Sequence, residues 1–384
     1  MNHHAETTFP DDGSSSDDVG GRRRAVDPDL ARQLRAVRTR GASDLHLTVG
    51  RPPMIRVDGQ LDELADEAAL SASGIDRMLA SVLDDARSAT YAERQQVDFS
   101  ITMTGAGRFR VNAFRQLGSP AAALRAISDV IPTVASVGVP PHVERVAHFG
   151  YGLVLFVGPT GSGKSTTQAA LIDSVNASRP CHILTIEDPV EYVHGAGRAL
   201  VNQREVGTDV HSFADGLRAA LREDPDLILL GEMRDEESVS SALTLAETGH
   251  LVFATLHTND AAQTIDRIVD SYASDRREQV QTQLAGALQA IVSQRLVPRV
   301  GGGRAAAFEV IIANDAIRNL VREGKTRQIR NAVATGRADG MCTMEQSFNS
   351  LVAAGAMSYV DAMALTQYPK EIWDPSVDRR QVAR

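Results

Sequence analysis

The nine residues GPTGSGKST, numbers 158 to 166, have the types and spacing needed to hold a triphosphate. They fit the pattern G-x-x-x-x-G-K-[ST], in which glycines let backbone N–H groups curl around a β-phosphate. Lys164 would place a charge at the β- and γ-phosphates, and Ser165 would offer a hydroxyl to Mg²⁺. An apolar run precedes the segment and a helix-forming run follows it, so the phosphates would face a helix N-terminus. The expected nucleotide-binding residues are Gly158, Pro159, Thr160, Gly161, Ser162, Gly163, Lys164, Ser165 and Thr166.

Hydrolysis of a bound triphosphate also needs an acid near the metal and a group that positions the attacking water. Glu187 follows the apolar run HILTI, Glu232 follows LILLG, and two histidines, His250 and His257, bracket LVFATL. Ligands of parallel sheets bind at the carboxyl ends of strands, so these clusters could face the nucleotide. The residues alone leave alternatives open. An acid at a strand end is often a helix N-cap, Asp188-Pro can be a simple turn, and a single histidine is more often structural.

Size and composition indicate a soluble protein with two domains. The chain has 384 residues, of which 43% are apolar and 23% charged, and its formal net charge is -9. A single hydrophobic core rarely grows to this size. The acidic total argues against a protein that coats nucleic acid. The two cysteines, Cys181 and Cys342, favour reduced thiols in the cytoplasm, and no apolar run reaches the roughly 20 residues that cross a bilayer.

The first half of the chain predicts a disordered polar tail (1–27), a small α+β domain (28–131) and a proline-containing linker (132–141). Alternating apolar residues and turn signals predict the elements of the small domain. These are a helix from Asp27, strands at 44–50 and 52–59, a helical stretch at 75–92, strands at 98–103 and 107–116 joined by a hairpin, and a strand at 124–127.

Beyond Gly150 the pattern changes to buried-type strands that alternate with helices, which is typical of a parallel sheet with crossover helices. The sequence therefore predicts an α/β domain over residues 142–370. From about Asp275 to Tyr368 the pattern predicts mostly helix with one strand at AAAFEVI, and a tail follows at 371–384.

Taken in order, these segments resemble the type II/IV secretion and pilus ATPase superfamily. TIEDPVE is similar to its Asp box, DPDLILLGEMRD to its Walker B segment, and TGHLVFATLHTNDA to its His box. The resemblance runs from about Gly41 to Tyr368 and is closer still to the PilT-type retraction ATPases, whose AIRNLIRE signature is similar to AIRNLVRE at 316–323. It implies a RecA-like P-loop ATPase domain preceded by a PAS-like domain.

Several roles are implied by the resemblance. Glu187 would polarise the lytic water, and Glu232 would join Ser165 at the Mg²⁺ site. His250 and His257 would lie in the motif that senses the γ-phosphate. Arginines of the small domain complete a neighbour's site in this family, because a guanidinium stabilises charge that develops on the transferred phosphoryl group. The matching candidates are Arg108, Arg110 and Arg125.

The resemblance implies a cytoplasmic homo-hexameric motor that uses ATP and Mg²⁺ to power type IV pilus retraction and twitching motility at the membrane-embedded pilus base. Its expected partner is an inner-membrane platform protein, and a paralogous pilus ATPase could be a second; no nucleic acid is expected. An extension or secretion ATPase and an accessory nucleotide-binding subunit stay open as alternatives. The retraction function is favoured by AIRNLVRE and by a cysteine count too low for the four-cysteine zinc cluster of many extension motors. A DNA-translocating ATPase is disfavoured by the acidic charge.

Overall fold

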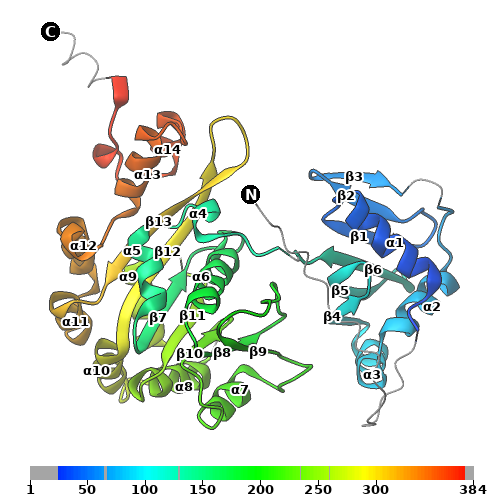
Figure 1. The fold of residues 1–384 in the computed structure, drawn as a ribbon, viewed down its shortest axis with the longest axis horizontal. Helices are drawn as coiled ribbons and strands as arrows, with labels where there is room; N and C mark the ends of the chain where they lie inside the picture. The colour runs from blue at the N-terminus through cyan, green and yellow to red at the C-terminus, as the bar shows by residue number, and fades with distance from the viewer. Residues whose placement is uncertain (1–24, 65–66, 129, 234, 259, 377–384) are drawn as a thin grey trace. The chain divides into compact units, whose positions relative to one another are not determined.

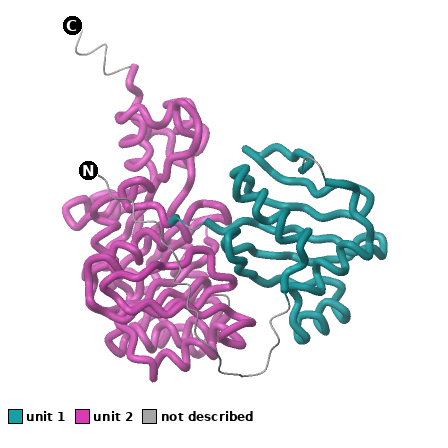
Figure 2. Tube along the Cα trace, turned by 45° about the vertical axis from the view of Figure 1, so that its right-hand side comes forward, with its two compact units in different colours: residues 1–130 teal, residues 131–384 magenta. Residues whose placement is uncertain are grey.

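The computed structural model describes residues 25–64, 67–128, 130–233, 235–258 and 260–376. The chain forms two compact units, residues 1–130 and 131–384 (Figures 1 and 2). Their boundary lies one residue before the expected linker at 132–141. Residues 1–24 of the expected N-terminal tail and 377–384 of the expected C-terminal tail lie outside the described residues.

The first unit is an antiparallel sheet in the strand order β3-β2-β1-β6-β5-β4. Alternation along the strands gives this sheet one apolar face, because Leu45, Leu124, Val111 and Phe99 lie side by side across neighbouring strands. The three helices contribute to the same buried cluster. The elements are α1 (Pro28–Thr39), β1 (Asp44–Thr48), β2 (Met54–Val57), β3 (Gln60–Glu63), α2 (Ala72–Val82), α3 (Asp85–Arg94), β4 (Gln96–Met103), β5 (Gly107–Gln116) and β6 (Ser119–Ala126).

Three details of this unit differ from expectation. The helical stretch expected at 75–92 is two helices, because the Asp84 side chain accepts a hydrogen bond from the Arg87 backbone N–H and caps a new helix, α3. The strand expected at 124–127 begins earlier, at Ser119, after a turn at Leu117 and Gly118. Asp27, placed at the end of the expected tail, is buried and caps α1.

The second unit contains a sheet in the order β13-β12-β7-β11-β10-β8-β9, parallel except for the pairing of β12 with β13. Helices cover both faces, as the buried clusters on the two sides show, which confirms the predicted α/β class. The strands are β7 (Gly152–Val157), β8 (His182–Glu187), β9 (Leu200–Glu205), β10 (Leu227–Leu230), β11 (Leu251–Leu256), β12 (Leu288–Pro298) and β13 (Arg304–Ile312).

The helices of this unit are α4 (Val134–Val137), α5 (Pro141–Glu144), α6 (Lys164–Ser178), α7 (Phe213–Ala220), α8 (Glu236–Glu247), α9 (Ala261–Asp270), α10 (Arg277–Ala287), α11 (Asp315–Arg322), α12 (Ile329–Thr335), α13 (Met344–Ala353) and α14 (Tyr359–Leu365). Short 3₁₀ turns are η1 (Arg145–His148), η2 (Thr326–Gln328), η3 (Arg337–Asp339) and η4 (Pro369–Glu371). Among the described residues, no helix is long and apolar enough to cross a membrane.

The expectation of one strand within 275–368 was wrong, because β12 is a second strand of this region and lies in the interior of the sheet. It is inserted between β7 and β13 and is buried on both faces, so it lacks the alternation that marks a half-buried strand. Even its polar residues Ser293 and Gln294 are each only 1% exposed.

The start of the expected C-terminal tail is anchored to the preceding helices. Ile372 is buried in a cluster with Phe348 and Met357. The Asn349 amide donates to the Glu371 carbonyl at 2.8 Å, and its side-chain oxygen accepts from the Trp373 N–H at 2.8 Å. The packed part of the chain therefore extends past residue 370.

Candidate functional site

The phosphate loop joins β7, which is buried at all six positions, to the first residue of α6. Gly158 has a φ of 141° and Gly163 a φ of 88°, values that side chains with a Cβ atom rarely adopt. Packing also demands glycine, since a Cβ atom on Gly158 would lie 2.4 Å from the backbone oxygen of Gln294. Sequence and structure therefore agree on a tight strand-to-helix loop with its N–H groups at a helix N-terminus.

Lys164 is buried inside this loop. Its ammonium donates to the backbone oxygens of Gly158 at 2.7 Å and Pro159 at 3.1 Å. Burial lowers the pKa of Lys164, while the negative charges of Glu191 and Glu232 act in the opposite direction. The Lys164 ammonium is thus hydrogen-bonded only to neutral carbonyl oxygens. A negatively charged group such as a phosphate would be a stronger partner for it.

The carboxyl ends of the neighbouring strands meet the phosphate loop at one edge of the sheet. In the register, Leu256 of β11 pairs with Val157 of β7, and Leu230 of β10 pairs with Ile186 of β8. His257, the residues after Leu230, and Glu187 therefore emerge at the same edge as Gly158, as Figure 1 shows for the strands that carry them.

Glu187, the last residue of β8, has a defined set of hydrogen-bond donors. Its Oε1 accepts from Thr185 Oγ1 at 2.7 Å and from Gln203 Nε2 at 3.3 Å, and its Oε2 accepts from the Glu191 N–H at 3.5 Å. Burial raises the pKa of this carboxyl group above its ordinary value. Glu187 is therefore held in a fixed orientation and is a stronger proton acceptor than an exposed glutamate.

Glu232 and His257 approach each other, with Nε2 of the histidine 3.5 Å from Oε2 of the glutamate. The Glu232 side chain is 12% exposed and the His257 side chain 45% exposed. The Met233 N–H donates to the Thr255 oxygen at 2.9 Å, so the segment after β10 is hydrogen-bonded to β11 near its end, two residues before His257.

His250 lies at the amino ends of the parallel strands, whereas the phosphate loop lies at their carboxyl ends. His250 precedes Leu251, which pairs with Gly152 at the amino end of β7, whereas His257 follows the carboxyl end of the same strand. Its Nδ1 atom lies 3.1 Å from the Leu245 oxygen and 3.3 Å from Thr248 Oγ1, at the end of α8. The structure therefore does not bring His250 to the nucleotide loop, although the histidines bracket one short strand.

The three arginines expected to complete a neighbour's site lie on β5 and β6 of the first unit. Arg110 and Arg125 face each other across these strands. Arg125 bonds Asp44 at 2.9 Å and is 72% exposed, Arg110 bonds Asp98 at 3.4 Å and is 45% exposed, and Arg108 donates to Ser100 at 2.7 Å. These contacts all lie within the first unit.

The structure adds residues to this edge that the sequence reading did not single out. Tyr192 approaches Thr166, with their hydroxyl oxygens 3.0 Å apart. Gln203, on β9, joins Glu187 to the Tyr192 carbonyl, which accepts from its Nε2 at 2.8 Å. Strand β9 was not expected, so only its position beside β8 reveals Gln203, whereas Tyr192 stands directly after the acidic segment and could have been noticed.

Metal binding at this edge would rest on oxygen donors. No group of three or more His, Cys, Asp or Glu residues in the described part of the chain has the arrangement of a metal site. Mg²⁺ does not require such a cage, because it is usually held by one or two protein oxygens, phosphates and water. The exposed Ser165 hydroxyl and the Glu232 carboxylate are donors of the right kind.

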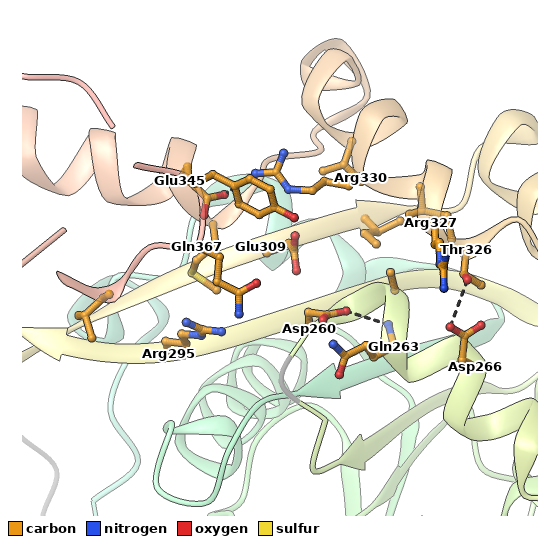
Figure 3. A pocket seen from close by; sticks show the side chains of 17 residues that line it. Asp260, Gln263, Asp266, Arg295, Glu309, Thr326, Arg327, Arg330, Glu345 and Gln367 are labelled. Atoms are coloured by element: carbon orange, nitrogen blue, oxygen red, sulfur yellow. Dashed lines mark hydrogen bonds and ion pairs between the residues drawn. The ribbon is translucent and has the colours of Figure 1, made fainter. Parts of the chain in front are cut away.

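A separate cavity of about 420 Å³ lies between β12, β13, α9, α12 and α13 (Figure 3). Its charged lining consists of Asp260, Asp266, Glu309, Glu345, Arg295, Arg327 and Arg330. Glu309 accepts from the Ala261 N–H at 3.4 Å, at the first residue of α9. Burial, together with the charges of Asp260 and Glu345, raises the pKa of Glu309 to about 7, and Arg330 offsets part of this rise.

The raised pKa predicts how a Glu309→Gln substitution will act. The native state favours protonated Glu309, so ionisation costs stability as pH rises from the ordinary value of 4.5 through about 7. At about 1.4 kcal/mol per pKa unit, the variant should gain at most about 3.5 kcal/mol in free energy of unfolding at pH 8. The gain should vanish near pH 4, where glutamate is neutral. Denaturant titrations across this range test it. The exposed Glu247→Gln serves as control, and a gain that is independent of pH would contradict the assignment.

Comparisons with known proteins place the chain in a family. Residues 22–367 match the family described as "Type II/IV secretion system protein". The chain is 45% identical over 342 residues to the "Type IV pilus retractation ATPase PilT" of Pseudomonas aeruginosa, covering 89% of this chain and 99% of that protein. It is 47% identical over 307 residues to a "Twitching motility protein" of Neisseria gonorrhoeae, covering 80% of this chain and 82% of the relative.

Solved structures agree with these sequence matches. The crystal structure of the pilus retraction motor PilT with bound ADP has a TM-score of 0.83 and 48% identity, covering 89% of this chain and 98% of that one. The ATPase DotB of Legionella pneumophila has a TM-score of 0.78 at 28% identity, covering 88% and 94%. The similarity thus extends over the phosphate loop, the strand ends beside it and both compact units. The chain belongs to the type II/IV secretion system protein family, and within it to the PilT-type pilus retraction ATPases.

Proposed function

We propose that this chain is the ATP-hydrolysing motor of type IV pilus retraction. The observation that carries the proposal is a buried phosphate-loop lysine, beside two strand-end glutamates, in a chain 45% identical to a pilus retraction ATPase over nearly the whole of both proteins. The match to the pilus assembly ATPase PilB of Thermus thermophilus, 35% identical over 59% of this chain, is weaker. Retraction is therefore favoured over extension.

The nucleotide would bind to the loop from Gly158 to Thr166. Lys164 would leave the Gly158 and Pro159 oxygens for the β- and γ-phosphates, gaining charged partners in place of neutral ones. Ser165 and Glu232 would hold Mg²⁺, directly or through water. When bound, the metal would neutralise charge that develops on the phosphate oxygens.

Glu187 would position and polarise the attacking water. Thr185 and Gln203 already occupy its Oε1 atom, and its raised pKa makes the carboxylate a better proton acceptor than an exposed one. His257 lies beside Glu232 at the same edge and would respond to the γ-phosphate through that pair. His250 has no part in this arrangement, because it lies at the other edge of the sheet.

Arg108, Arg110 and Arg125 would complete the site of a neighbouring subunit in a homo-hexamer. A head-to-tail interface that closes on itself produces such a ring. Nucleotide binding and release would then move the two compact units of each chain as rigid bodies about the linker near Pro132. We infer a cytoplasmic protein that acts at the membrane-embedded pilus base on an inner-membrane platform protein.

Substituting Lys164 tests the nucleotide site and the biological function together. Lys164→Ala should reduce ATP binding and turnover below detection, because the phosphates lose their buried positive charge. In cells that lack the native gene, this variant should leave excess surface pili and no twitching. Lys370→Ala, on an exposed turn, is the control and should behave as wild type. Cells without pili would instead indicate an extension motor.

Glu187→Gln separates binding from chemistry. The amide keeps the shape and one acceptor oxygen but cannot take a proton, so ATP affinity should stay within about twofold while turnover falls by about 10²–10⁴-fold. Binding is measured by isothermal titration and turnover by phosphate release, with Glu247→Gln as the matched control. Normal turnover in Glu187→Gln would remove this residue from its proposed role.

The AIRNLVRE helix, α11, offers a test of motor output. Arg318 donates to the Ala285 and Gly286 oxygens at 2.7 and 2.6 Å, where α10 ends, so Arg318→Ala should lower stability by about 2 kcal/mol. Arg322 is exposed, and its side chain donates to the Asn319 side-chain oxygen at 2.8 Å within the same helix. Arg322→Ala should hydrolyse ATP normally and fold as wild type, yet abolish twitching. Normal twitching in Arg322→Ala would show that the exposed face of α11 has no role in motor output.

A further inference from the structure

Gln294, on β12, is a buried glutamine whose side-chain amide lacks a partner. The residue is 1% exposed, and neither Oε1 nor Nε2 has a hydrogen-bond partner among the described residues. A buried amide in this state is costly, because it has lost its water without replacing it. Native proteins satisfy most such groups, so this exception requires an explanation.

The position of Gln294 ties it to both ends of the phosphate loop. Strand β12 runs parallel to β7 with Ser293 paired to Val157, so Gln294 lies level with Gly158. A Cβ atom on Gly158 would lie 2.4 Å from the Gln294 backbone oxygen, and one on Gly163 would lie 2.9 Å from its Nε2 atom. A single residue therefore packs against the first and last glycines of the loop.

The loop will need a new hydrogen-bond donor when nucleotide binds. The Lys164 ammonium bonds the Gly158 oxygen at 2.7 Å, and Gly158 is buried. When Lys164 moves to the phosphates, this carbonyl loses its donor where water has little access. The Pro159 oxygen, the second partner of Lys164, belongs to an exposed residue and can be hydrated.

We propose that Gln294 is a positioning residue of the nucleotide site, whose amide N–H group replaces Lys164 on the Gly158 carbonyl when nucleotide binds. The inference rests on the proposed function, because it requires Lys164 to move to a phosphate. Ser162 would take part in the same exchange of hydrogen bonds. Its hydroxyl is buried without a partner among the described residues and lies 2.8 Å from the Cβ position of Gly158. In the nucleotide-bound state this hydroxyl would donate to Gln294 Oε1.

This role gives substitutions opposite effects on stability and on binding. Without nucleotide the amide is unsatisfied, so Gln294→Met, which keeps its length and removes its polar atoms, should raise the melting temperature by a few degrees. With nucleotide the Gly158 carbonyl would then stay unpaired. The Kd for a fluorescent ATP analogue and the KM for ATP should therefore rise about tenfold, while kcat changes less than twofold.

Ser293→Ala is the matched control. Ser293 is on the same strand, is also 1% exposed, and has a hydroxyl without a partner, but alternation places its side chain on the other face of the sheet. This variant should raise the melting temperature without changing the Kd. Gln294→Leu likewise supplies no donor and leaves no polar atom in this position, so its Kd should rise about as much as that of Gln294→Met.

The measurements use the full chain and separate this inference from the proposed function. If wild-type protein bound no ATP analogue, the proposed function and this inference would both fail. If wild type bound it and Gln294→Met bound it equally well, only the role of Gln294 would be lost. If Gln294→Met failed to fold, Gln294→Leu would decide, since an unchanged Kd in that variant would overturn the proposal.

Discussion

The arrangement of this protein depends on one buried positive charge. Lys164 has left water, and two backbone oxygens satisfy it in place of a counterion. Neutral oxygens solvate an ammonium less well than water does, which is why its pKa is lowered. Keeping it there requires glycines at positive φ, a buried strand on each side and β12 packed against the loop. The loop can therefore bind an anion, because the Lys164 ammonium has only neutral hydrogen-bond partners.

The second constraint is that all residues of the site must leave the sheet at the same edge. Parallel strands ensure this for Glu187, Glu232 and His257, since each follows the carboxyl end of its strand. The same rule excludes His250, which is seven residues from His257 in the chain yet lies at the amino end of β11. Closeness in the sequence therefore does not predict closeness in space for these two histidines, because β11 runs from the amino ends to the carboxyl ends of the parallel strands.

Sequence reasoning predicted the parts of the site that local chemistry determines. The phosphate loop, the strand before it and the acidic residues after buried strands are all visible as short patterns. It did not predict β12 or β9. Polar residues interrupt the apolar run of β12 (LQAIVSQRLVP), in a stretch whose pattern predicted mostly helix, and β9 (LVNQRE) has only two apolar residues. The residues that these strands contribute were therefore missed. Gln294 contacts loop residues that are more than a hundred positions away in the sequence. Gln203 reaches Glu187 only because β9 pairs with β8.

The contrast among the arginines explains how a motor could share residues between subunits. Arg330 is partly buried, bonds Glu345 and Glu371 and stacks on Tyr368, so releasing it would leave a buried carboxylate unpaired. Arg110 makes an exposed ion pair with Asp98, whose side chain is 50% exposed. Arg125 instead bonds Asp44, whose carboxylate is buried. Exposed pairs contribute about 0–1 kcal/mol, whereas a guanidinium at a phosphate in a site that excludes water contributes considerably more. If a neighbouring subunit offers a triphosphate, Arg110 can therefore exchange Asp98 for a phosphate at little cost to its own fold, whereas Arg125 would leave the buried Asp44 carboxylate unpaired.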